Sequence, residues 1–272
     1  MAPRLKNLKV PKHRGGNLDE EITRITTFTR NYVNEAGARG VVIGMSGGVD
    51  SAVVSFLSVK ALGAKRVTAL LLFEDEFKKG KDYKDAERLI SKIKIERVEF
   101  DITRVIDAFQ NAFLNWGFKT SKVSLANVKA RVRMTLLYLV ANERKLLVIG
   151  TGDRSEESIG YFTKYGDGGV DFMPIAHLYK TEVKALARKL GVPRNIIEKP
   201  SSPNLWKGHT ATDELPVDYP FLDKILKLLL DRKKSEASAS KLSGVSLKTV
   251  REVVRRHKYS EHKRKYPPMI SG

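Results

Sequence analysis

The sequence predicts an α/β fold: a doubly wound parallel sheet with helices on both faces and extra helices at the C-terminal end. Apolar runs that read as strands alternate with segments of ten residues or more that have helical periodicity. The run Val67–Phe73 is apolar over its whole length, which is typical of a parallel strand buried on both faces. The strands are expected at residues 41–45, 67–73, 97–100 and 146–149.

The first helix is expected to begin after Asn17, whose side chain can cap it, and to end at Gly37 or Gly40. Its first turn is acidic, which suits the positive end of the helix dipole. Its buried face is expected to consist of Ile22, Ile25, Phe28 or Thr29, Tyr32 and Val33. Later helices are expected to end at Leu62 and to span residues 85–94, 103–116, 121–144, 181–190, 193–197, 218–232, 235–243 and 246–258. Loops are expected at residues 74–84 and 199–216.

Composition limits the possible functions. The 272 residues suffice for a well-formed core, and we expect a single domain over residues 17–272 after a basic flexible tail, residues 1–16. The tail has no apolar segment behind it, so it does not read as a signal peptide. The absence of cysteine excludes disulfides, thiolate metal sites and cysteine catalysis. A cytoplasmic location, with no membrane partner, is the expectation.

The chain is strongly basic. It has 50 Lys and Arg against 31 Asp and Glu, for a formal net charge of +19. Such a charge favours polyanionic partners, either nucleic acid or phosphorylated small molecules. A lysine-rich solvated surface, as in many proteins from hot environments, explains the same number equally well.

A glycine turn joins the first strand to the second helix. Gly47 and Gly48 let backbone N–H groups approach an anion closely, and the following helix adds its positive N-terminus. Ser46 and Ser51 supply hydroxyl groups, and Asp50 supplies a carboxylate that can hold Mg²⁺. No Lys-Ser or Lys-Thr pair follows the glycines, so this is not a Walker A loop. The plainer reading is a structural turn.

Other candidate residues lie just after the last strand and on the long helix before it. Six glycines fall within residues 150–169, where each weakens regular structure, and Glu156 can provide a second carboxylate opposite Asp50. Helix N-terminal stabilisation is the plainer role for Glu156. Arg131 shares a helix face with Asn127 and Thr135 and can hold a phosphate, although spacing alone favours a surface arginine.

The order Ser-Gly-Gly-Val-Asp-Ser at residues 46–51 resembles the pyrophosphate loop of the ATP pyrophosphatase superfamily. Residues 150–169, 174–183 and 200–215, and the final Glu-His-Lys-Arg at 261–264, resemble motifs of ammonia-dependent NAD synthetases. The motifs occur in the expected order, and the resemblance runs from about residue 18 to about residue 268. It implies an adenine nucleotide alpha hydrolase-like fold.

The resemblance also implies site residues. ATP is expected on Gly44, Met45, Ser46, Gly47, Gly48, Val49, Asp50, Ser51, Thr151, Lys180 and Ser202. Deamido-NAD is expected on Arg131, Lys164, Asp171, His262 and Lys263. Mg²⁺, the expected cofactor, is assigned to Asp50 and Glu156, and the catalytic residues are Asp50, Lys180 and Asp171. A homodimer is expected, with the dinucleotide near the subunit interface.

The reaction implied by the resemblance is the ATP-dependent amidation of deamido-NAD. The nicotinate carboxylate attacks the α-phosphorus of ATP and releases pyrophosphate. Ammonia then attacks the adenylated carboxyl group and expels AMP. A glutamine-hydrolysing version would need a further domain with a cysteine nucleophile, so free ammonia is the expected nitrogen source.

Two other functions stay open at this stage. The positive charge is compatible with a tRNA-modifying enzyme of the same superfamily, although thiolation normally requires cysteines. Residues 238–250, followed by Arg251, Arg255 and Arg256, resemble a helix-turn-helix DNA reader. A helix pair that packs on the core or on a dimer partner explains that segment more simply, and no nucleic acid partner is expected.

Overall fold

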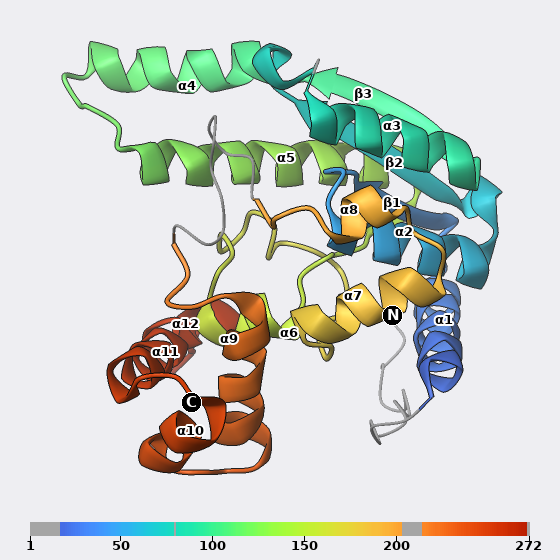
Figure 1. The fold of residues 1–272 in the computed structure, drawn as a ribbon. Helices are drawn as coiled ribbons and strands as arrows, with labels where there is room; N and C mark the ends of the chain where they lie inside the picture. The colour runs from blue at the N-terminus through green and yellow to red at the C-terminus, as the bar shows by residue number, and fades with distance from the viewer. Residues whose placement is uncertain (1–16, 79, 203–213, 271–272) are drawn as a thin grey trace.

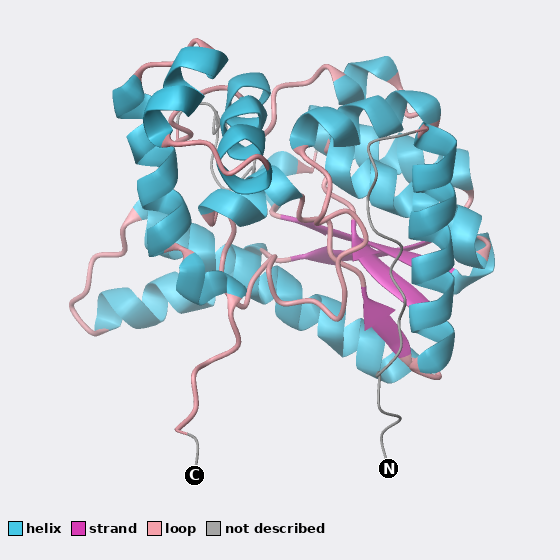
Figure 2. Ribbon diagram, turned by 90° about the horizontal axis from the view of Figure 1, so that it is seen from below, coloured by secondary structure: helices cyan, strands magenta, loops and turns pink. Residues whose placement is uncertain are grey.

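The computed structural model describes residues 17–78, 80–202 and 214–270. Four parallel strands form one sheet in the order β3-β2-β1-β4. Their bounds are Gly40–Gly44 for β1, Val67–Phe73 for β2, Glu96–Asp101 for β3 and Leu146–Val148 for β4. The sheet lies inside a shell of helices, as the magenta strands of Figure 2 show. The predicted α/β fold is confirmed.

The order of the strands reverses between β1 and β4. The chain steps from β1 to β2 and β3, and then returns to place β4 on the other side of β1. In such sheets the ligand binds outside the carboxyl ends of the two strands where the order reverses. Here those ends lead into the glycine turn after Gly44 and into the segment after Gly150.

Helices cover both faces of the sheet (Figure 1). On one face lie α1 (Leu18–Glu35), α2 (Val49–Leu62), α3 (Lys81–Ile93), α7 (Lys180–Lys189) and the short α8 (Arg194–Ile197). On the other lie α4 (Thr103–Asn115) and α5 (Lys122–Arg144). Because strand side chains alternate, Val41 and Ile43 of β1 enter the first core and Val42 enters the second.

The remaining α-helices form a separate layer, called here the C-terminal layer. They are α6 (Arg154–Ile159), α9 (Tyr219–Leu226), α10 (Glu236–Ser243), α11 (Leu247–Tyr259) and α12 (Glu261–Arg264). In Figure 1 the C-terminal helices, in orange and red, lie together below the sheet. Their core includes Leu222, Ile225, Ala239, Val250 and Val253, each fully buried.

Most predicted elements are confirmed, and the differences have local causes. The Asn17 side chain accepts a 3.0 Å hydrogen bond from the Asp19 N–H, as a cap should. Helix α3 begins at Lys81 rather than at residue 85, because Gly80 in extended conformation already serves as its N-cap. The helix expected at 218–232 changes at Leu226 into a π turn, Lys227–Asp231. The short helix α12 was not predicted.

Two sequence-based expectations lie outside the described residues. These are the basic tail, residues 1–16, and the central part of the 199–216 loop, residues 203–213. Within the described ranges, none of the helices combines the length and the apolar character that crossing a membrane requires.

Candidate active site

The glycine turn is held in shape by its own hydroxyl groups. Ser46 Oγ accepts a 3.2 Å hydrogen bond from the Gly48 N–H and lies 3.1 Å from Ser51 Oγ. Ser51 Oγ also donates to the Gly48 carbonyl at 3.1 Å. Gly48 is the N-cap of α2 and no side chain caps that helix, so its first N–H groups are available to an anion.

Gly47 must be glycine for two reasons. Its φ of +76° is strained for other residues, and a Cβ atom there would lie 2.1 Å from the Asp82 carbonyl oxygen of α3. The other predicted members of the loop anchor it: Gly44 ends β1, and Met45 and Val49 are buried in the core. The loop is therefore a rigid cradle between β1 and α3.

The ammonium group of Lys180 lies at the centre of the site. Its side chain is 0% exposed, and Nζ lies 2.8 Å from Asp50 Oδ2, 2.9 Å from Asp153 Oδ2 and 2.7 Å from Glu156 Oε1. Asp50 comes from α2, and Asp153 and Glu156 come from the start of α6. The structure thus brings Asp50, Glu156 and Lys180 together, as predicted, and adds Asp153.

Three carboxylates around one ammonium leave the cluster short of positive charge. Burial, together with the charge of Asp153, raises the pKa of Glu156 to about 8, despite the opposing effect of Lys180. Burial likewise raises the pKa of Asp153 to about 6. Although burial alone would lower it, the three carboxylates hold the pKa of Lys180 well above its usual value. The excess negative charge of the cluster favours the binding of a further cation here.

Helix α9 fixes the position of Lys180. The Lys180 N–H donates to Ser155 Oγ at 2.9 Å, and Ser155 Oγ donates to Asp223 Oδ1 at 2.5 Å. The Thr181 N–H donates to the other oxygen of Asp223 at 2.8 Å. The Lys180 ammonium lies 5.0 Å from the ring centroid of Tyr219, a cation–π distance.

Asp153, Tyr219 and Asp223 were not predicted from the sequence as site residues. The position of Asp153 before the acidic residues of α6 could have identified it as an N-cap, and its Oδ1 indeed accepts the Glu156 N–H at 2.9 Å. Tyr219 and Asp223 lie more than 35 residues beyond Lys180 in a helix with no motif of its own, so no local signal pointed to them.

The residues present fit Mg²⁺. Asp50 Oδ1 is buried and has no hydrogen-bond partner among the described residues, and carboxylate oxygens are the ligands that Mg²⁺ prefers. Within the described ranges, no three acidic or histidine side chains already form a closed metal site. Mg²⁺ is commonly bound through one or two carboxylates together with waters and substrate phosphate oxygens, so Asp50 and Glu156 would suffice.

Three of the residues predicted to bind deamido-NAD lie around the loop after α6. Arg131 donates to the Lys164 carbonyl at 3.3 Å. Lys263 Nζ donates to the carbonyls of Gly160 and Phe162 at 2.8 and 2.7 Å, so α12 packs back onto this loop. His262 is exposed on α12. Asn127 accepts a 2.7 Å hydrogen bond from Thr163 of the same loop, so it shares a helix face with Arg131, as the spacing predicted.

Asp171 lies apart from that group, beside the edge strand. Its Oδ2 accepts the Val148 N–H at 2.7 Å and its Oδ1 accepts the Tyr138 hydroxyl at 3.2 Å. Its carboxylate thus holds the segment after Gly169 against β4. Thr151 follows the carboxyl end of β4. Ser202 is half-buried and is the last described residue before the gap at residues 203–213.

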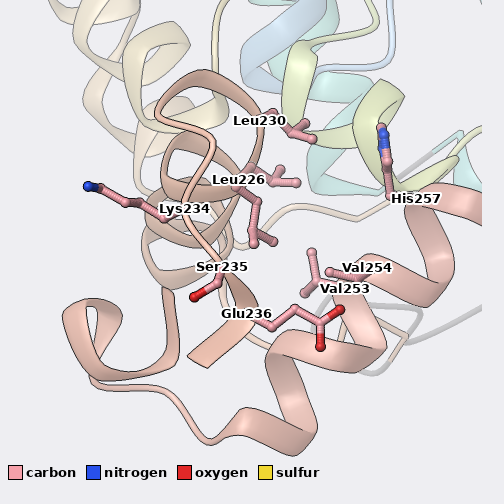
Figure 3. Close-up of a pocket in the computed structure, with 9 residues that line it drawn as sticks. Leu226, Leu230, Lys234, Ser235, Glu236, Val253, Val254 and His257 are labelled. Atoms are coloured by element: carbon pink, nitrogen blue, oxygen red, sulfur yellow. The ribbon is translucent and has the colours of Figure 1, made fainter. Parts of the chain in front are cut away.

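A cavity lies in the C-terminal layer, between α9 and α11 (Figure 3). It has a volume of about 270 Å³ and is lined by Leu226, Leu229, Leu230, Lys234, Ser235, Glu236, Val253, Val254 and His257. None of the described site residues lines it. Its small size and apolar walls do not suit a dinucleotide.

The helix-turn-helix resemblance has a structural explanation. Gly244 has a φ of +76° and ends α10, and Ser246 caps α11. Val250 and Val253 of α11 are fully buried in the C-terminal core. The pair therefore packs on the rest of the chain, as the simpler reading expected.

The comparisons with known sequences point to a single protein family. Residues 21–267 match the sequence model of a family described as NAD synthase. The chain is 47% identical to the NH(3)-dependent NAD(+) synthetase of Hyperthermus butylicus over 244 residues, which cover 90% of this chain and 87% of the relative. It is 44% identical to the corresponding protein of Archaeoglobus fulgidus over 253 residues, with coverage of 93% and 97%.

Solved structures give the same result. An NMN synthetase from Francisella tularensis superposes with a TM-score of 0.83 at 34% identity, covering 94% of this chain and 100% of that one. An NH3-dependent NAD synthetase from Campylobacter jejuni, solved with a nitrate ion, superposes with a TM-score of 0.78 at 30% identity, with the same coverage.

Proposed function

The chain belongs to the NAD synthase family, and from this premise we propose that the Lys180 cluster is the ATP site of an ammonia-dependent NAD synthetase. The enzyme amidates deamido-NAD with ammonia, consumes ATP, and releases AMP and pyrophosphate. The observation that carries the site assignment is the meeting of Asp50, Glu156 and Lys180, which belong to three separate motifs of the chain, beside the glycine turn.

The chain's part in the reaction is binding and charge stabilisation. The N–H groups at the start of α2, together with Ser46 and Ser51, contact the ATP phosphates. Lys180 holds Asp50 and Glu156 in fixed positions and offsets negative charge on the departing pyrophosphate. Thr151 and Ser202 complete the ATP site. The nicotinate carboxylate attacks the α-phosphorus, and ammonia then attacks the adenylated carboxyl carbon.

Asp50 and Glu156 would hold Mg²⁺. The orphaned Oδ1 of Asp50 and the shortage of positive charge in the cluster support this assignment. When bound, the ion neutralises phosphate charge and makes the α-phosphorus a better electrophile.

Deamido-NAD occupies the region around the loop after α6. Arg131, Lys164 and Lys263 bring three positive charges to that region, which suits a dinucleotide pyrophosphate. His262 lies beside Lys263 and extends the site along α12. Asp171 acts from the β4 edge, where its contact with Val148 orients the segment that faces the nicotinate.

The enzyme acts as a homodimer through the outer face of α4. Ile106 is the one buried residue of this helix, and a set of seven apolar side chains on α4 and on the chain just after it is at least 39% exposed. The set consists of Val105, Phe109, Phe113, Leu114, Trp116, Phe118 and Val123. Figure 1 shows α4 at the outer edge of the molecule, above α5. An apolar patch of this kind on a protein surface is typical of an interface.

The enzyme functions in the cytoplasm, where ATP is available to it, and residues 17–272 act as one catalytic domain. The contacts of Asp223 support the second statement, because they join the C-terminal layer directly to the helix that carries Lys180.

The test is a product assay with purified protein. ATP, Mg²⁺, ammonium and deamido-NAD are mixed, each is omitted in turn, and NAD and AMP are quantified. NAD formed only with all four present supports the proposal. Because one similar structure is an NMN synthetase, the assay includes nicotinate mononucleotide as a second substrate, and a higher kcat/KM with it would overturn the choice of dinucleotide.

A further inference from the structure

Lys199, a residue outside every motif discussed so far, contacts the glycine turn directly. It follows α8, and its Nζ donates a 2.8 Å hydrogen bond to the carbonyl oxygen of Gly47. The same ammonium group is ion-paired with Asp82 and lies 3.3 Å from Asp85 Oδ2. The Lys199 side chain is 14% exposed. A charged group held by three acceptors at this depth has a fixed position.

The contact with Gly47 fixes the orientation of the peptide group between Gly47 and Gly48. The Gly47 carbonyl and the Gly48 N–H belong to one planar trans peptide, so they point in opposite directions. When Lys199 holds the carbonyl, the Gly48 N–H is directed to the other side, where Ser46 Oγ lies 3.2 Å away. The positive charge on Lys199 also polarises this peptide and makes its N–H a stronger donor.

The carboxylates around Lys199 serve to place it. Asp85 is 1% exposed, and its other oxygen accepts a 2.9 Å hydrogen bond from Asn195 of α8. Asp82 supplies a carboxylate to Lys199 and also the backbone oxygen that a side chain on Gly47 would strike. The turn is therefore clamped between α3 and the chain after α8.

We propose that Lys199 is a positioning residue for ATP: it holds the Gly47–Gly48 peptide, and with it the glycine turn and the Gly48 N–H to Ser46 Oγ hydrogen bond, in the conformation that receives the phosphates. The inference rests on the proposed function, since it assigns a role within the same ATP site. It requires that loss of the Lys199 ammonium weaken the interaction with ATP specifically and leave the sites of the other two substrates intact.

The test is the variant Lys199→Met, compared with Lys199→Arg and with a matched control. The control is Lys92→Met, because Lys92 Nζ also donates to a glycine carbonyl, that of Gly191 at 2.7 Å, on an exposed surface. Lys199→Met is expected to raise the KM for ATP and the Kd measured by calorimetry about tenfold, with the KM for ammonia and deamido-NAD within about twofold of wild type. Lys199→Arg should recover part of the loss, and Lys92→Met should behave as wild type.

A purely structural role gives a different result. Partial unfolding would lower apparent kcat and leave the KM for ATP unchanged, and that pattern would overturn the proposal, as would wild-type affinity for ATP. If Lys199→Met fails to fold, the variant Lys199→Met with Asp82→Asn removes the charge imbalance and gives the same readout. If wild-type protein neither binds ATP nor forms NAD, the proposed function fails and not the role of Lys199 alone.

Discussion

The Nζ atom of Lys180 donates a 2.8 Å hydrogen bond to Oδ2 of Asp50, although 130 residues separate the two in the chain. The contact joins the helix after the glycine turn to the helix that begins at Lys180. It also brings Asp50 to the carboxylates of α6, which reach the same ammonium group.

Replacing Lys180 with Met should destabilise the protein and remove its activity. The change leaves three carboxylates without their shared counter-ion, and breaking a buried ion pair costs about 3–5 kcal/mol. Denaturant unfolding should show this loss, and NAD formation should fall at least about 100-fold. Lys189→Met is the control, because Lys189 lies on the same helix in an exposed pair with Asp19. Near-normal turnover by Lys180→Met would exclude a central role for this lysine.

The variant Gly47→Ala should lose affinity for ATP. A methyl group there would lie 2.1 Å from the Asp82 carbonyl, so the turn must move. Gly37→Ala is the matched control, since Gly37 also has a positive φ, of +66°, but has open space around it. Both variants should lose about 1–2 kcal/mol of stability from backbone strain. Only Gly47→Ala should weaken ATP binding in calorimetry. Equal affinities for ATP in the two variants would contradict the role of the glycine turn in binding the phosphates.

Much of the fold could be predicted because its signals are local. The apolar run of β2, the cap at Asn17 and the glycine turn each depend on neighbouring residues. Glu156 was also expected opposite Asp50, and both carboxylates contact the Lys180 ammonium group. Tyr219 and Lys199 could not be found in this way. Their roles come from contacts across 39 and 152 residues of sequence, which only tertiary packing determines.

The stability of the protein should depend on Glu21 at mildly acidic pH. Burial alone would raise its pKa, but hydrogen bonds from His177 and Arg24 lower the pKa to about 2 from its usual 4.5. A lowered carboxyl pKa stabilises the fold above pH 4.5, and the contribution is lost as pH falls from there toward 2.

The variant Glu21→Gln checks this pH dependence. At pH 7 it should reduce the free energy of unfolding by about 1–3 kcal/mol, through loss of hydrogen bonds to a charged group. The difference from wild type should shrink as pH falls from 4.5 to 3. Denaturant titrations across this range measure it, with the exposed Glu20→Gln as control. A difference that stays constant with pH would show that the charge of Glu21 does not matter.

The proposed dimer can be tested by substitutions on the outer face of α4 and at its C-cap. Leu114 and Trp116 are 61% and 74% exposed, so replacing both with Glu should leave the fold of one subunit intact. Light scattering should give a dimer for wild type and a monomer for the double variant, because like charges would face each other across the interface. Leu242→Glu, at an exposed position of α10, should remain dimeric. A monomeric wild type at all concentrations would refute the interface.

Adenylation of the nicotinate carboxylate at this site can be followed with an isotope label. Deamido-NAD labelled with ¹⁸O in its carboxylate is converted with ATP, Mg²⁺ and ammonium, and the products are analysed by mass spectrometry. Attack of the carboxylate on the α-phosphorus requires one ¹⁸O atom to appear in AMP for each NAD formed. Label in pyrophosphate, or unlabelled AMP beside newly formed NAD, would contradict adenylation of the nicotinate carboxylate.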